Sequence, residues 1–392
     1  MGAVKGRAGK RAESTGLSVA LDILPLAGDK TGVGRFCAGL VGALIGRDAL
    51  EVRGYAVARH ARAEMTVPAE RAGLAVRTWD IPARFANAVW MRASLAPIEW
   101  LVGDVDVVHG TNYVVPPTRR AARVVTVHDL TAVRYPQLCL PASLAYPQLV
   151  KKAAGQGAFV HVPSRFVGEE VVELLGVEAE RVRVVPHGVE RRAIEPGPVA
   201  GRPSKPLAPK APYVLALGAV EPRKDLPSLV TAFAELAADN DDFVLVVAGP
   251  PGWGEAAFAA AVARAGVAPR VVRLGYLEEG ERQALLCGAA VLAYPSLYEG
   301  FGFPPLEAMA AGVPVVATAA GAVPEVVGDA AELVAPGDPA ALAGALARVI
   351  GDEALRATLI AKGRARAASF TWAASAAGML ELYREAALEG TR

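Results

Sequence analysis

The chain has 392 residues, more than a single hydrophobic core usually supports, and this length predicts two domains. Hydrophobic residues make up 53% of it and charged residues 21%, while the net charge is only +1, so nucleic acid is not an expected partner. The three cysteines, Cys37, Cys139 and Cys287, show no metal-binding spacing and are predicted to be core residues of a protein in a reducing cytoplasm.

Residues 1–15, MGAVKGRAGKRAEST, are basic and small, and they predict a disordered tail. The apolar run behind them is similar to part of a signal peptide, but Asp22 within it and the lack of an A-x-A site favour a buried strand. No apolar run reaches the roughly 18 to 20 residues that span a bilayer. The protein is therefore expected to be cytoplasmic, or peripheral on the inner face of the membrane.

Short apolar runs alternate with helix-like stretches and are predicted to be parallel strands. The first series is LSVALDIL, VRGYAVA, DVDVVHG, RVVTVHDL, AFVHVPS and RVRVVPHGV, and the second is YVLALGAV, FVLVVAGP, RVVRLGYL, AAVLAYPS and VPVVATAAG. The stretch between them, residues 195–212, is too rich in proline for a helix and is predicted to be a linker. The pattern predicts the α/β class, with two Rossmann-like, doubly wound parallel-sheet domains, 16–194 and 213–370, facing a cleft.

A glycine-containing turn, TGVGRF, follows the first strand and opens a helix-like run. Gly32 and Gly34 would lie on the face where ligands of open α/β sheets bind, so they are candidate ligand-binding residues. An ordinary tight strand-to-helix turn is the alternative.

Histidines stand near the predicted strand ends, which face the cleft. His128, in TVHDL, is the first candidate for a residue near acceptor and donor sugar, with Asp129 as its acceptor-side neighbour, because imidazole both donates and accepts hydrogen bonds. His109, in DVVHGTNY, is the second acceptor-side candidate, and His187, in VVPHGV, a hinge-side one. For each, a hydrogen-bonded packing histidine is the alternative.

Two further features have competing interpretations. Asp104 and Asp106 form a D-x-D that could hold Mg²⁺, although Asp106 begins a buried strand and we expect no metal. An aromatic and basic stretch could rest on an anionic membrane, or could be a packed helix pair beside the cleft; it contains Trp79, Trp90, Trp100, Phe85, Arg77, Arg84 and Arg92.

Two cations stand at the first strand-to-helix turn of the second domain. In GAVEPRKDLPSL, Arg223 and Lys224 precede a helix start signalled by Asp225 and Pro227, with Gly218 ending the strand. Fixed cations there stabilise the charge that develops on a leaving nucleoside diphosphate. The alternative is a solvated surface pair.

The segment YPSLYEGFGFPPLEAMAAGVPVVA carries two glutamates eight positions apart. Pro304 and Pro305 suit a first helical turn, so Glu299 is predicted in the loop and Glu307 in the first turn of the helix. The helix start would form an anion pocket for a pyrophosphate, with Glu299 accepting from a sugar hydroxyl and Glu307 from a ribose hydroxyl. An acidic residue favoured by the helix dipole is the alternative for Glu307. The donor-binding set is completed by Gly300, Phe301, Gly302 and Leu306.

This E-x7-E segment, with its GFGFP core and the following AAGVPVVAT, resembles that of the retaining glycosyltransferases of family 4, which have the GT-B fold. The resemblance extends from about residue 17 to the C-terminus. It implies that the helix predicted at 371–392 crosses back to the first domain, and that the TGVGRF loop closes near donor phosphates and acceptor. The family usually has an arginine directly after Gly218; this chain has Ala219, so Lys224 matches the family lysine and Arg223 is the expected partner.

The resemblance implies a metal-independent hexosyltransferase without a cofactor. A sugar would pass from a nucleoside diphosphate, with GDP-mannose as first guess, to an acceptor hydroxyl on a glycan, a glycolipid or a small molecule. Retention would follow from same-face attack assisted by the departing phosphate oxygen. A sugar-nucleotide epimerase or phosphorylase of the same architecture and a catalytically lapsed nucleotide-binding scaffold are the alternatives.

Overall fold

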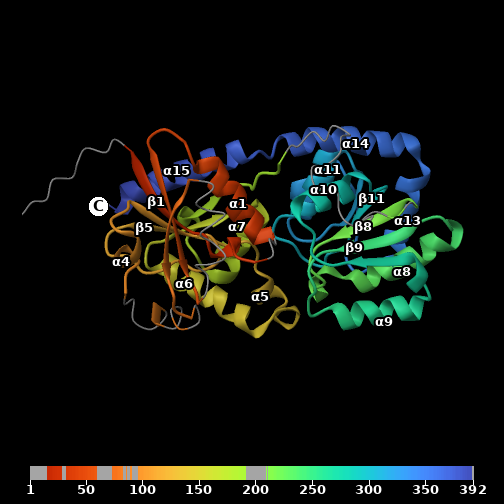
Figure 1. Cartoon of the computed structure of the whole chain (residues 1–392), viewed down its shortest axis with the longest axis horizontal. Coiled ribbons are helices and arrows are strands. Elements are labelled where there is room, and N and C mark those ends of the chain that lie inside the picture. Colours follow the sequence, from red (N-terminus) through yellow and green to blue (C-terminus); the bar gives the residue numbers. More distant parts are fainter. Residues whose placement is uncertain are drawn as a thin grey trace, which may run out of the picture.

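The computed structural model of the chain describes residues 16–28, 32–59, 73–82, 85, 89–90, 96–190, 209 and 211–390. Two lobes lie side by side, each built on a parallel sheet with helices packed against it (Figure 1). This confirms the predicted α/β class with two Rossmann-like domains. The predicted tail at 1–15 and most of the predicted linker, 195–208 and 210, lie outside the described residues.

The N-terminal domain contains a seven-stranded sheet in the order β3-β2-β1-β4-β5-β6-β7. Its strands are β1 Leu17–Asp22, β2 Leu50–Val57, β3 Ala75–Trp79, β4 Val107–Gly110, β5 Ala122–Thr126, β6 Phe159–Val162 and β7 Val182–Val184. Its described α-helices are α1 Gly32–Leu44, α4 Glu99–Val102, α5 Thr131–Arg134, α6 Tyr146–Gly155 and α7 Arg165–Leu175.

The C-terminal domain contains a six-stranded sheet in the order β10-β9-β8-β11-β12-β13. Its strands are β8 Tyr213–Leu217, β9 Val244–Ala248, β10 Val271–Leu274, β11 Val291–Tyr294, β12 Val315–Thr318 and β13 Glu332–Val334. The helices of this half are α8 Leu226–Asp239, α9 Glu255–Ala265, α10 Glu279–Cys287, α11 Phe303–Ala311, α12 Val323–Val327, α13 Pro339–Gly351, α14 Glu353–Ala368 and α15 Trp372–Gly390.

The central strands are apolar without alternation because helices cover both faces of each sheet. In β4 and β11 every residue is buried. The edge strands β3 and β13 were not predicted, since β3 contains Arg77 and alternates in exposure while β13 has only three residues. Strand order reverses between β1 and β4 and between β8 and β11, and ligands of such sheets bind at these switch points.

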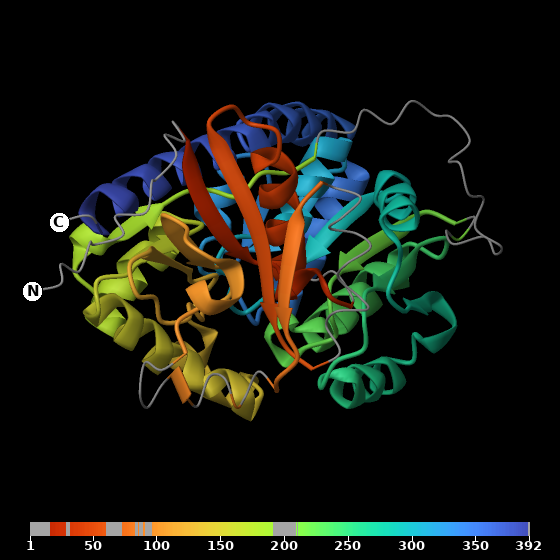
Figure 2. The same ribbon diagram turned by 60° about the vertical axis from the view of Figure 1, so that its left-hand side comes forward.

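Helix α15 returns to the N-terminal domain, as the family resemblance implied. It follows α14 along one side of both lobes and packs against α1 and β5 (Figure 1). Arg181 and Arg183 near β7 pair with Glu389 and Glu385 of α15, and Figure 2 shows the end of the chain beside this domain. No helix among the described residues is long and apolar enough to cross a membrane.

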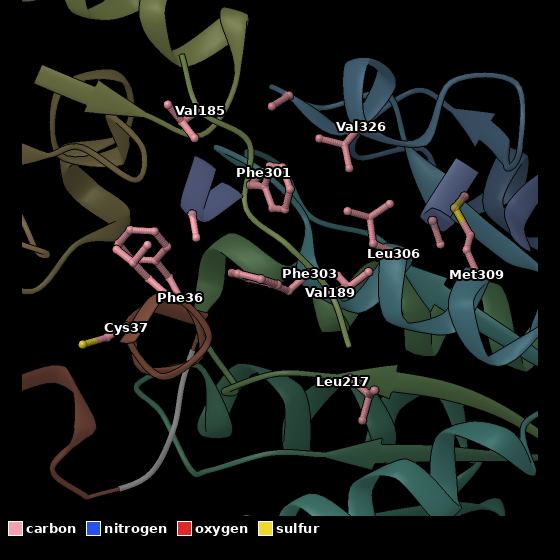
Figure 3. Close-up of a cluster of buried hydrophobic side chains, with 14 of the residues drawn as sticks. Phe36, Cys37, Val185, Val189, Leu217, Phe301, Phe303, Leu306, Met309 and Val326 are labelled. Atoms are coloured by element: carbon pink, nitrogen blue, oxygen red, sulfur yellow. The ribbon is translucent and has the colours of Figure 1, made fainter. Parts of the chain in front are cut away.

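One hydrophobic cluster continues from one domain into the other. Phe36 of α1 belongs to the same buried cluster as Phe301 and Phe303 of the C-terminal domain (Figure 3). His187, at the end of the N-terminal domain, lies between them, with ring centroids 4.3 Å from Phe36 and 5.3 Å from Phe303. The domains are thus in direct apolar contact beside the cleft.

Candidate active site

A cavity of about 320 Å³, the main cavity, lies between the domains at the C-terminal ends of both sheets. Residues of both domains line it, which fits the switch-point position. From the N-terminal domain these are Gly32, Val33, Arg35, His128, Asp129 and His187. The C-terminal residues include Gly218, Glu221, Arg223, Lys224, Tyr276, Arg282, Tyr294, Glu299, Gly300, Phe301, Gly302 and Glu307.

Glu299 forms a buried ion-pair cluster with both predicted cations. Lys224 Nζ lies 2.6 Å from Glu299 Oε1, and Arg223 Nη1 lies 2.7 Å from Glu299 Oε2. Lys224 also donates to the Tyr294 hydroxyl at 3.1 Å, and Arg223 to the carbonyl of Tyr298 at 2.9 Å. The loop after β11 and the turn after β8 therefore meet in one charged group, which excludes the interpretation of Arg223 and Lys224 as a solvated surface pair.

Burial and charge act in opposite directions on this cluster. Burial would raise the pKa of Glu299, but the charges of Arg223 and Lys224 outweigh it and lower the pKa to about 2. Burial lowers the pKa of Lys224 against the attraction of Glu299. The pKa of Arg223 lies well above its usual value: burial, the largest single effect, lowers it, but the combined attraction of Glu299, Asp129 and Glu221 outweighs burial. Glu299 is therefore ionised at neutral pH, and two basic side chains against one carboxylate give the cluster a formal net charge of +1.

Glu307 also lines the main cavity and belongs to a second ion-pair cluster. Its Oε1 lies 2.5 Å from Arg35 Nη1 and its Oε2 lies 2.8 Å from Arg282 Nη1. The same two arginines pair with Glu279 at the start of α10. Arg35 comes from the N-terminal domain, so this cluster connects the two domains across the cleft.

The position of Glu307 corrects one detail of the sequence prediction. Helix α11 begins at Phe303, before the two prolines, so Glu307 occupies its fifth position instead of its first turn. Gly302 precedes the helix with a φ of 119°, a conformation that favours glycine. Proline fits the first helical positions because their N–H groups have no intrahelical partner.

Gly300 allows a close approach between the domains. A Cβ atom at this position would lie 1.8 Å from the carbonyl oxygen of His128. Beside it, Ser164 Oγ donates to the Gly300 carbonyl at 2.8 Å. Position 300 therefore requires glycine because the backbone of the N-terminal domain lies too close for a side chain. The predicted close approach of a ligand is a separate reason.

His128 lines the main cavity with one nitrogen already bonded. Its Nε2 lies 2.8 Å from the carbonyl oxygen of Thr111, so Nε2 carries the proton and Nδ1 is an acceptor. Burial lowers the pKa of His128 to about 4, against smaller opposing effects of Thr111 and Asp129. A neutral imidazole at this position can accept a hydrogen bond from a sugar hydroxyl.

Three of the predicted residues do not line the main cavity. His109 is fully buried, with Nδ1 2.7 Å from the Tyr383 hydroxyl of α15 and Nε2 2.7 Å from Thr126 Oγ1. The structure thus places it in the core, as a packing histidine, instead of on the acceptor side. Gly34 and Leu306 are buried inside α1 and α11, whereas Gly32 reaches the cavity because α1 begins there.

Sequence reasoning did not select Arg35 and Arg282 as site residues. Arg35 stands inside the TGVGRF motif, and Arg282 lies one helical turn after Glu279, so the sequence contained a local signal for each. His187, predicted only as a hinge-side residue, lines the main cavity, and among the described residues neither of its buried ring nitrogens has a hydrogen-bond partner.

The two features with competing interpretations lie elsewhere. Asp106 accepts hydrogen bonds from the backbone N–H and hydroxyl of Ser18 at 2.8 and 2.7 Å, so it joins β4 to the N-terminal end of β1, remote from the cleft. In the aromatic stretch Trp90 is packed in the core, whereas Phe85 and Trp100 are exposed. Arg84 and Arg92 lie outside the described residues.

Two Rossmann-like domains facing a cleft, with charged clusters on both sides of it, define a protein of the GT-B class. Residues 31–192 match the model of "Glycosyltransferase Family 4" and residues 201–366 that of "Glycosyl transferases group 1". The chain belongs to this glycosyltransferase family and is a transferase.

Curated relatives agree with this membership. The O-antigen chain mannosyltransferase B of Escherichia coli is 29% identical over 70% of this chain and 73% of its own length. The MMP alpha-(1->4)-mannosyltransferase of Mycolicibacterium hassiacum is 31% identical over 72% and 71%. The D-inositol 3-phosphate glycosyltransferase of Nocardia farcinica is 32% identical over 74% and 66%. These relatives do not favour the epimerase, phosphorylase or scaffold alternatives.

Solved structures show the same fold. Sucrose-phosphate synthase from Thermosynechococcus elongatus superposes with a TM-score of 0.74 at 23% identity, covering 94% of this chain and 98% of its own. Anabaena Alr3699/HepE in complex with UDP-glucose gives 0.71 at 19% identity, covering 94% and 100%.

Proposed function

We propose that this glycosyltransferase transfers a hexose from a nucleoside diphosphate to an acceptor hydroxyl, with retention at the anomeric carbon. The observation that carries the proposal is the buried cluster of Arg223, Lys224 and Glu299 in the main cavity. It places one net positive charge where the C-terminal ends of the two sheets face each other. A diphosphate is the part of the donor that matches this charge.

The cations act on the leaving group. As the bond between sugar and phosphate breaks, negative charge grows on the diphosphate, and the preorganised Arg223 and Lys224 stabilise that charge more than they stabilise the ground state. Both side chains are already held by Glu299, so little reorganisation is needed during the reaction. The positive dipole end of α11 adds to this, with the N–H of Phe303, since Pro304 and Pro305 have no N–H to offer. These groups provide the electrostatic role of a metal ion, and we propose a metal-independent reaction.

The carboxylates and His128 orient the sugars. Glu299 and the backbone of Gly300 to Gly302 face the donor hydroxyls, and His128 Nδ1 accepts from a hydroxyl on the other side. Glu307 accepts from the ribose; its oxygens keep lone pairs for this beside their bonds to Arg35 and Arg282.

Retention follows in this proposal from attack on the face that the diphosphate leaves. Glu299 is the carboxylate beside the donor sugar, and two cations hold it, so it is a poor covalent nucleophile of the kind that retaining glycosidases use. The departing phosphate oxygen then takes the proton of the acceptor hydroxyl while the new glycosidic bond forms on the same face.

Two relatives are named as mannosyltransferases, which supports mannose as the transferred sugar, and we propose GDP-mannose as its donor. The acceptor hydroxyl belongs to a glycan, a glycolipid or a small molecule. With a glycolipid, exposed Phe85 and Trp100 offer an apolar contact to an anionic membrane surface.

The test is the melting temperature of the protein with UDP, GDP, dTDP and ADP and with their sugars, without added metal. Binding raises the melting temperature by mass action. A shift with GDP and GDP-mannose that is lost in Glu307→Ala supports the proposal, and NMR of the product gives the anomeric configuration. No shift with any nucleotide, or an inverted product, contradicts it.

A further inference from the structure

A second cavity, the side cavity, adjoins the main cavity and has a volume of about 220 Å³. The two cavities share one wall, which consists of Val33, His128, Asp129, Glu221 and Arg223. A ligand in the side cavity therefore lies next to a donor sugar bound in the main cavity, as the acceptor of a sugar transfer must. Figure 1 shows α5, which carries part of the lining, on the side of the N-terminal domain that faces its partner domain.

The lining of the side cavity is largely apolar and aromatic. Tyr113 and Tyr146 stack with ring centroids 4.9 Å apart and an interplanar angle of 5°. Trp253, from the loop before α9, lines the cavity from the C-terminal domain with 45% of its surface exposed. Leu140 is 49% exposed beside it. An indole that is open to solvent at a cavity offers its face to the C–H groups of a sugar ring.

The backbone holds Tyr113 in an unusual conformation. Its φ is 57°, in the left-handed region that a tyrosine seldom occupies. Its hydroxyl donates to the carbonyl of Asp129 at 3.1 Å and accepts from the N–H of Asp129 at 3.0 Å. The loop after β4 thus fixes the aromatic wall and the position of Asp129 together.

Polar groups in the side cavity remain available for a ligand. Thr131 is 6% exposed, and its hydroxyl oxygen is buried without a hydrogen-bond partner among the described residues. Asp129 Oδ1 accepts from the N–H of Thr131 at 2.9 Å, which leaves Oδ2 for another donor. Buried polar groups are normally hydrogen-bonded, so an unpartnered hydroxyl at a cavity points to a ligand hydroxyl.

The charges of the lining select against an anionic ligand. Of the described residues that line the side cavity, the charged ones are Asp129, Glu221 and Arg223. Arg223 is already paired with Glu299 at 2.7 Å and lies 3.5 Å from Glu221. A phosphate group here would meet two carboxylates and a single cation, Arg223, which the diphosphate of the donor also engages in our proposal.

We infer that the side cavity is the acceptor subsite and that it selects an uncharged sugar, with Trp253 as the stacking residue and Thr131 and Asp129 as hydroxyl partners. This inference rests on the proposed function, because it assigns the main cavity to the donor. On this inference the protein differs from glycosyltransferases whose acceptor is a sugar phosphate.

The test uses a matched pair of probes, methyl α-D-mannopyranoside and its 6-phosphate, together with D-inositol 3-phosphate. Binding to the full chain, saturated with GDP, is measured by saturation-transfer NMR, which needs no turnover. The neutral glycoside is expected to bind and the two phosphates to bind at least tenfold more weakly. Binding of a phosphate instead, or of none of the probes, overturns the inference.

Two variants locate the binding. Trp253→Ala is expected to weaken the neutral glycoside about tenfold, whereas Leu388→Ala, which truncates an exposed apolar side chain outside both cavities, leaves its affinity unchanged. Thr131→Val keeps the shape and removes the unpartnered hydroxyl, so it should weaken the glycoside without lowering the melting temperature. Equal affinity in wild type, Trp253→Ala and Thr131→Val overturns the inference.

The melting-temperature shift with GDP keeps the two proposals apart. Suppose that GDP still raises the melting temperature of Trp253→Ala and Thr131→Val, but that neither substitution weakens binding of the neutral glycoside. The acceptor inference is then wrong, and the proposed donor site stands. Absence of the shift in the wild type contradicts the proposed function itself.

Discussion

Arg35 Nη1 of α1 lies 2.5 Å from Glu307 Oε1 of α11, and this ion pair connects two domains through residues 272 positions apart in the sequence. Both side chains are largely buried, with 19% and 12% of their surface exposed. An ion pair in such a position loses less to solvent screening than a surface pair does. It holds the cleft closed around the carboxylate that we propose for the ribose.

Arg35→Gln should loosen this connection and raise the KM for the donor about five- to twentyfold, with a smaller effect on kcat, because fewer molecules have a closed cleft. Initial rates over a range of donor concentrations measure it. Arg348→Gln, which removes an exposed arginine paired with Glu332 in the C-terminal domain, is the control. A donor KM equal to that of the wild type would show that the pair does not support donor binding.

Lys224→Ala should lower kcat by about a hundred- to a thousandfold, because it removes a fixed cation beside the leaving diphosphate. The melting-temperature shift with the nucleoside diphosphate should also shrink. Lys362→Ala, at a half-exposed lysine paired with Asp329, is the matched control. An unchanged kcat in Lys224→Ala would remove this residue from the mechanism.

Glu299→Gln should reduce stability as well as activity, because Lys224 then loses the carboxylate with which it is paired and Arg223 keeps only the more distant Glu221, at 3.5 Å. Removing one partner of a buried ion pair costs about 3 to 5 kcal/mol, or about 6 to 20 °C in melting temperature for a domain of this size. Differential scanning calorimetry measures the change. If Glu299→Gln had the melting temperature of the wild type, solvent would already screen the charges of Arg223 and Lys224.

The buried histidines predict how stability depends on pH. Burial lowers the pKa of His128 and His161 to about 4, and it lowers the pKa of His109 and His187 well below the usual value. Between pH 6.5 and 4 the unfolded chain therefore binds protons that the folded chain does not. Each such histidine removes about 1.4 kcal/mol of stability per pH unit over this window and none above pH 7.

The melting temperature should accordingly fall steeply from pH 7 to pH 5.5 while staying nearly level from pH 7 to 8. Glu299 does not contribute to this pH dependence of stability. Its pKa is about 2 in the folded protein and 4.5 in the unfolded chain, so it affects stability only below about pH 4.5. His161→Asn should make the slope shallower. A level melting temperature between pH 7 and 5.5 would contradict the buried, neutral state of these imidazoles.

Local chemistry made much of the site predictable. Arg223 and Lys224 were found because a cation pair between a strand and a proline-marked helix start has few other functions. The place of Glu299 followed from Pro304 and Pro305, since proline is tolerated in a first helical turn and not further inside. The start of α11 was placed slightly late, because Phe303 carries no such signal of its own.

Long-range packing decided what these signals could not. His109 lies near the end of β4 and His128 just after β5, and the ends of both strands face the cleft. Tyr383 of α15, 274 residues further on, nevertheless covers His109, and of these two histidines His128 alone reaches the main cavity. The roles of Arg35 and Arg282 depend in the same way on a glutamate that the domain arrangement brings to them.

By itself the sequence determined the strands, the strand-to-helix turns and the charged residues at those turns, because backbone preferences and apolar periodicity act over a few neighbouring residues. Only the tertiary structure decided which side chains face the cavities and which are buried partners of one another. That choice depends on contacts between segments far apart in the chain, and on the burial that those contacts impose on each charge.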